Sequence, residues 1–66
     1  MNTTDRLVLM ANQIAANLAR EPDPAAATAH HIRLYWDPRM KTMIRGSAIS
    51  GLTDVAAAAV AQLENV

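Results

Sequence analysis

One short stretch decides the fold: residues 35–40 read YWDPRM and mark a corner between two helices. An aspartate side chain accepts hydrogen bonds from the free N–H groups of a first helical turn, so Asp37 is a predicted N-cap. Proline suits the first helical position, where no N–H donor is needed, so Pro38 is predicted to open the next helix. Trp36 is the only tryptophan in the chain. We expect its side chain to pack in the protein's own core and also to anchor a partner, because Trp, Tyr and Arg dominate interface energetics.

The same signals recur on both sides of this corner. Asp23-Pro24 repeats the capping pair, and Gly46 is a natural stop for a helix. Thr4, or its neighbour Thr3, and Thr53 are further predicted caps, because their side chains can accept from the free N–H groups at the start of a helix. The sequence therefore predicts an all-α fold, a small bundle of about four short helices at approximately residues 4–20, 24–35, 38–45 and 54–64. With 66 residues, the chain is expected to form a single domain, residues 1–66.

The predicted helix at residues 4–20 carries two apolar stripes. The i, i+3, i+4, i+7 spacing predicts one buried face, made of Leu7, Met10, Ala11, Ile14, Ala15 and Leu18. A second, mixed stripe consists of Val8, Leu9, Asn12, Ala16 and Ala19. A surface helix of a free-standing domain normally places more charge there, so this stripe indicates a second contact surface. Asn12 is a mediocre helix former, and two interpretations stay open: its amide bonds a partner's backbone, or it is an exposed polar residue.

Composition indicates a thin core. Apolar residues make up 52% of the chain, but 14 of them are alanine, which favours helix and buries little area. The sequence contains no cysteine, so neither a disulfide nor a thiolate–metal site adds stability. A chain of this size commonly gains the missing stability from another subunit or from a second copy of itself.

Charge and hydropathy exclude several classes of partner. Six basic residues balance six acidic ones and the pI is about 6.7, whereas nucleic-acid binders usually show a basic excess. No apolar run approaches the roughly 20 residues that span a bilayer. The first residues, MNTTDRLVLM, lack the basic region of a signal peptide. We therefore expect a cytoplasmic protein that binds neither nucleic acid nor membrane.

The sequence offers few residues that could form a metal-binding or catalytic site. Adjacent helical residues point about 100° apart, so His30 and His31 cannot both face one ion from the same helix. No acidic residue three or four positions away completes a metal-ligand set. The sequence contains neither a glycine-rich phosphate loop nor a nucleophile–base arrangement with a structural rationale. We expect no catalytic, cofactor-binding or metal-binding residues and predict that the chain is not an enzyme by itself.

Three motifs carry a resemblance to a known family. They are Leu7 with the MANQIA run at residues 10–15, His31-Ile32-Arg33, and the WDPRM run at residues 36–40. In this order and spacing the chain resembles, over nearly its whole length, the delta subunit of NAD-dependent formate dehydrogenase. MANQIA and WDPRM are the most specific parts of the match.

The resemblance implies a non-catalytic role within a larger enzyme. Such enzymes are cytoplasmic hetero-oligomers that convert formate to carbon dioxide and reduce NAD⁺. Their alpha subunit carries a molybdenum or tungsten bis-MGD cofactor and iron–sulfur clusters. The beta subunit carries FMN and the NAD site, and the gamma subunit carries a further cluster. The delta subunit is expected to bind no redox centre and to sit against the alpha subunit.

Three hypotheses of function follow. The first is an accessory subunit that docks on the catalytic alpha subunit and stabilises the complex. The second is a transient assembly factor that helps cofactor insertion into the alpha subunit, and the third is a self-associating helical module. The predicted interface combines the second stripe of residues 4–20 with the tryptophan corner: Val8, Leu9, Asn12, Gln13, Ala16, His31, Tyr35, Trp36, Arg39 and Met40.

Overall fold

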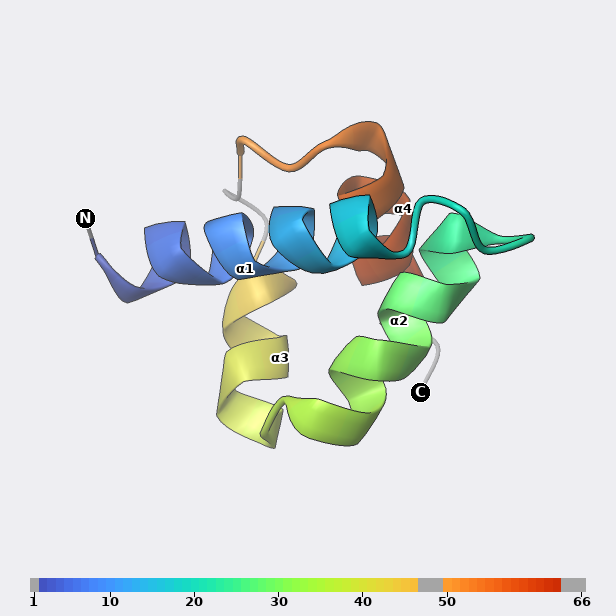
Figure 1. Cartoon of the computed structure of the whole chain (residues 1–66). Coiled ribbons are helices and arrows are strands. Elements are labelled where there is room, and N and C mark those ends of the chain that lie inside the picture. Colours follow the sequence, from blue (N-terminus) through green and yellow to red (C-terminus); the bar gives the residue numbers. More distant parts are fainter. Residues whose placement is uncertain (1, 47–49, 64–66) are drawn as a thin grey trace.

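The described part of the chain consists of four helices joined by short loops (Figure 1). The structure is a computed structural model, and it describes residues 2–46 and 50–63. The helices are α1 (Thr3–Asn17), α2 (Pro24–Tyr35), α3 (Pro38–Ile44) and α4 (Asp54–Leu63), and the described residues contain no strand. The predicted all-α class and its four helices are confirmed. However, α1 ends three residues earlier than predicted and α3 one residue earlier, while the predicted end of the last helix at Glu64 lies outside the described residues.

The first helix begins at a different cap from the one expected. Asn2, not Thr4, is the N-cap: its Oδ1 accepts from the N–H of Asp5 at 2.8 Å. The N–H of Asn2 in turn donates to an Asp5 carboxylate oxygen at 3.5 Å, which closes a reciprocal capping box. The prediction of Thr4 as the cap was wrong. Asn2 stands three residues before the acidic Asp5, and this pair provides acceptors for two N–H groups. No acidic residue stands three positions after Thr4, so a cap there would satisfy only one N–H group.

The other three helices begin at polar side chains that satisfy the same need. Asp23, Asp37 and Thr53 each accept from the N–H three residues later, at 3.1, 2.8 and 3.3 Å. A proline follows each of the two aspartates at the first helical position. These local contacts fix where the chain turns, and so they fix the corner between α2 and α3.

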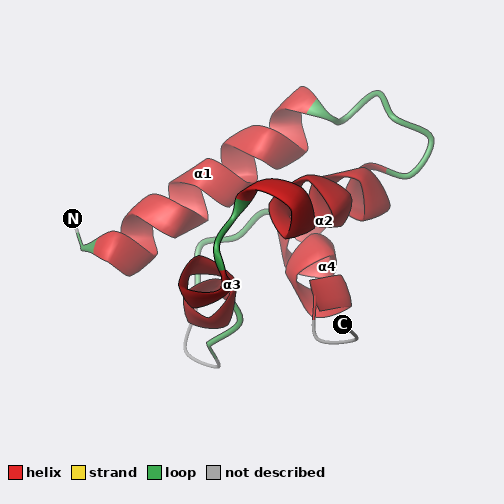
Figure 2. Cartoon of the chain, turned by 90° about the horizontal axis from the view of Figure 1, so that it is seen from below, coloured by secondary structure: helices red, strands yellow, loops and turns green. Residues whose placement is uncertain are grey.

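The helices are arranged with α1 crossing the other three (Figure 1 and Figure 2). The N-terminal half of α1 lies near α3, and its C-terminal half lies near α2 and α4. The most extensive packing is between α2 and α4. Alanine permits that packing, because Ala29 of α2 and Ala56 and Ala59 of α4 are completely buried and let the two backbones approach closely.

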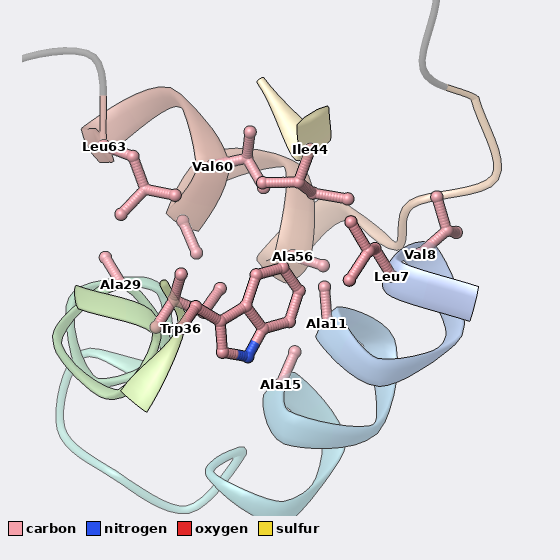
Figure 3. Close-up of a cluster of buried hydrophobic side chains, with 12 residues drawn as sticks. Leu7, Val8, Ala11, Ala15, Ala29, Trp36, Ile44, Ala56, Val60 and Leu63 are labelled. Atoms are coloured by element: carbon pink, nitrogen blue, oxygen red, sulfur yellow. The ribbon is translucent and has the colours of Figure 1, made fainter. Parts of the chain in front are cut away.

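Trp36 lies at the centre of the buried cluster, although it stands just after α2 (Figure 3). Its indole points toward small side chains of two helices, Ala11 and Ala15 of α1 and Ala56 of α4. It is 5% exposed. Because these neighbours are alanines, the space between the helices is wide enough for one large ring and is filled by it.

The buried face of α1 is rotated from the predicted one. Val8 was assigned to the second stripe, but it is 8% exposed and belongs to the core. Met10 was assigned to the buried face, but it is 43% exposed. The segment that leads into α4 explains this rotation, because it passes directly over Val8. A Cβ atom placed on Gly51 would lie only 3.5 Å from Val8 Cγ1.

Asn12 holds that segment in place. Its Nδ2 donates to the Gly51 carbonyl at 3.0 Å, and its Oδ1 accepts from the Thr53 N–H at 2.9 Å. Gly51 has a φ of +90°, a conformation that favours glycine, whereas Gly46 after α3 does not adopt a positive φ. The amide of Asn12 therefore bonds the backbone of its own chain, a role that neither interpretation from the sequence included.

We predict that Asn12→Ala lowers the free energy of unfolding by about 2 kcal/mol, since it removes two hydrogen bonds and leaves a backbone N–H and carbonyl without these partners. Urea unfolding followed by circular dichroism measures this change. Gln13→Ala is the matched control, because the neighbouring side chain is exposed. Equal stability of the two variants would contradict the tethering role of Asn12.

Candidate docking surface

An open groove of about 490 Å³ lies where α1, the end of α2 and the start of α3 face one another. We call it the apolar groove. Its lining residues come from all three helices and from the corner: Leu9, Met10, Gln13, Ile14, His31, Tyr35, Trp36 and Met40. None of them is an Asp, Glu, Lys or Arg. The groove therefore suits apolar and aromatic side chains rather than charged ones.

Large apolar side chains are exposed at the rim of this groove. Among the described residues, four large apolar side chains are exposed. Three of them line the groove: Leu9 is 53% exposed, Met10 43% and Tyr35 72%. The fourth, Leu34 at 62%, does not line it. Contiguous exposed apolar surface commonly marks an interaction site, whereas a single exposed leucine needs no explanation.

The corner and the helices supply different parts of the groove. Trp36 lines it while staying almost completely buried, so its indole contributes a fixed wall. Met10 and Met40 have long, unbranched side chains that adapt to irregular surfaces. On α2, the rings of His31 and Tyr35 lie 4.7 Å apart, centre to centre, at an interplanar angle of 42°. A groove that combines a fixed indole with flexible methionine side chains is well suited to bind an apolar segment.

Six of the ten predicted interface residues meet in this groove, namely Leu9, Gln13, His31, Tyr35, Trp36 and Met40. Met10 and Ile14 also line it, although helical periodicity predicts that both face the core. The MANQIA run contained both, but helical periodicity alone did not show that the buried face is rotated toward Val8.

The remaining four predicted residues lie elsewhere. Val8 is buried under the segment before α4, and Asn12 bonds that segment. Ala16 is exposed and lines a separate shallow depression beside α4. Arg39 is exposed but does not line the groove. The second stripe of α1 is therefore covered in part by the chain itself, and only Leu9 of that stripe contributes to the groove.

The described residues offer little for other kinds of site. No group of three or more His, Cys, Asp or Glu side chains among them is placed to hold a metal ion. His30 is exposed, whereas His31 is half-buried, so the two rings have different surroundings. In residues 2–46 and 50–63, no helix is long and apolar enough to cross a membrane.

The described residues thus form four helices with an open apolar groove beside the corner between α2 and α3. The particular family follows from comparison with known proteins. The family model described as NADH-dependent formate dehydrogenase delta subunit matches residues 6–60. The chain belongs to this family, as the motifs in its sequence predicted, and is the delta subunit of such a dehydrogenase. No curated protein and no solved structure shows significant similarity to it.

We predict that Trp36→Ala lowers the free energy of unfolding by about 3–5 kcal/mol, because it leaves a cavity between α1, α2 and α4. The expected packing of Trp36 in the protein's own core is confirmed by its 5% exposure, and its expected role as an anchor for a partner stays a prediction. Thermal unfolding followed by circular dichroism measures the loss. Leu34→Ala, at an exposed position outside the groove, should change stability little, and a Trp36→Ala variant as stable as this control would refute the central role of the indole.

Proposed function

We propose that this delta subunit is a non-catalytic accessory subunit that docks on the catalytic alpha subunit through the apolar groove and so stabilises the dehydrogenase complex. One observation carries the proposal: three of the four exposed large apolar side chains among the described residues gather at this groove. Burying a side chain of this size is worth about 1.5–3 kcal/mol. Three such side chains supply a substantial part of the driving force for association.

The size of the chain sets how much of it must be covered. A stable interface of standard size buries about 800 Å² on each partner. The whole accessible surface is 4404 Å², so such an interface would occupy nearly a fifth of it. The groove and its surroundings on α1, α2 and α3 would together form the contact, with Leu9 and Tyr35 near its centre, where hot-spot residues usually lie.

The direct test of the role is co-purification from the native cell. A tagged chain is isolated gently, its bound proteins are identified, and formate-dependent NAD⁺ reduction is assayed. Recovery of loaded alpha, beta and gamma subunits in equal stoichiometry with activity is the expected result. Recovery of cofactor-free alpha subunit alone would instead show an assembly factor, and a tight homodimer without dehydrogenase subunits would show a self-associating module.

We predict that Tyr35→Ala weakens association with the alpha subunit by about 2 kcal/mol, or roughly 30-fold in dissociation constant, because the side chain is lost from the groove. The affinity of purified variants for the remaining subunits, measured by titration calorimetry, provides the test. Leu34→Ala is the matched control, since this neighbour on α2 is also highly exposed but does not line the groove. Loss of affinity in Leu34→Ala alone would place the interface on a different surface.

A further inference from the structure

A second cavity, of about 190 Å³, is surrounded by three cationic side chains. Arg33 comes from α2, Lys41 from α3, and Arg45 is the C-cap of α3. Pro38, Thr42 and Leu63 complete the lining, and no acidic side chain of the described residues contributes to it. This cavity shares no lining residue with the apolar groove, so it is a separate feature of the molecule.

The Arg33 guanidinium is held in a defined position. Its Nη2 donates to the Gln62 carbonyl at 2.8 Å, a contact that ties α2 to the end of α4. Its Nε is buried and has no hydrogen-bond partner among the described residues. A guanidinium has five N–H donors, and the Gln62 carbonyl is bonded by Nη2 alone, so donors of Arg33 remain for a further acceptor.

Helix dipoles account for only part of the charge. Arg33 and Lys41 lie in the last turns of α2 and α3, and Gln62 lies in the last turn of α4, where carbonyl groups carry negative partial charge. Each helix end contributes at most about half an elementary charge, so three ends give roughly −1.5 against three full positive charges. Among the described residues, a surplus of positive charge therefore remains around the cavity.

The spacing on α3 places two of the cations side by side. Lys41 and Arg45 are four residues apart, so their side chains lie on the same face of the helix. Thr42 donates its hydroxyl to the Pro38 carbonyl at 2.9 Å and is therefore not a free donor for a ligand. The donors available to an anion are those of the two arginines and the lysine.

We infer that this cavity binds a phosphate group. A phosphate carries up to two negative charges and several acceptor oxygens, which match three cations better than a single carboxylate does, and arginine pairs with phosphate in a two-pronged geometry. The cavity is smaller than the several hundred Å³ typical of sites that enclose a whole small molecule. It therefore holds the phosphate group, either as the free ion or as the end of a larger molecule that extends into solvent.

The test is a titration of the full chain with sodium phosphate at constant ionic strength, followed by two-dimensional NMR and by the thermal unfolding midpoint. A ligand that binds the folded state raises this midpoint. We expect saturable shifts around residues 33, 41 and 45 and a raised midpoint. Methyl phosphate distinguishes the two sources, because tighter binding than that of the free ion indicates the end of a larger molecule.

Matched variants distinguish a specific phosphate site from non-specific electrostatic attraction. Lys41→Gln and Arg45→Gln should each weaken phosphate binding by about tenfold, the loss of one charge-assisted hydrogen bond. Lys41→Arg keeps the charge and should retain binding, which separates loss of the site from loss of the fold. Arg39→Gln removes an exposed cation that does not line the cavity and should change nothing. An equal loss in Arg39→Gln, or the absence of saturable binding, would overturn the proposal.

Glu64 lies outside the described residues and directly follows Leu63 of the cavity lining. Glu64→Gln therefore tests whether the chain itself supplies the anion. Binding that is unchanged or modestly tighter in this variant supports a site for an external phosphate. Binding that appears only in this variant would show that the cations serve an internal ion pair and would overturn the proposal.

Discussion

The structure depends on the contact of one indole with alanines of two helices. Trp36 leaves the end of α2, enters the space between α1 and α4, and faces Ala11, Ala15 and Ala56 there. Small side chains leave the room, and the ring fills it, so a chain poor in large apolar residues still has a closed core. The Asp37–Pro38 pair fixes the corner that presents the indole. Fold and groove share this residue, because the ring that closes the core also lines the apolar groove.

A second constraint determines which surface stays open. Asn12 binds both Gly51 and Thr53, and the segment before α4 therefore covers Val8 on one side of α1. Leu9 and Met10 are left on the side that faces away from this segment, where they are exposed. The long-range bonds of a single amide thus help to determine which apolar side chains of α1 are covered by the chain itself and which stay exposed.

Much of the fold could be predicted from sequence because its signals are local. The Asp23 and Asp37 caps act within one turn, and α2 begins and ends at the predicted residues. The rotation of α1 could not be predicted, because the segment that covers Val8 is about 40 residues away and leaves no mark on helical periodicity. The same long-range contact explains why Met10 and Ile14 were not predicted to line the groove and why Val8 and Asn12 do not line it.

The central claim is that the apolar groove is the face covered in the assembled dehydrogenase. The chain contains no cysteine, so single cysteines report on one position each. Gln13→Cys in the groove and Ala58→Cys on the exposed side of α4 are labelled with a thiol reagent in the free subunit and in the complex. The account predicts that assembly strongly slows labelling at position 13 and leaves the rate at position 58 nearly unchanged. Equal rates at position 13 in the free and assembled states would contradict it.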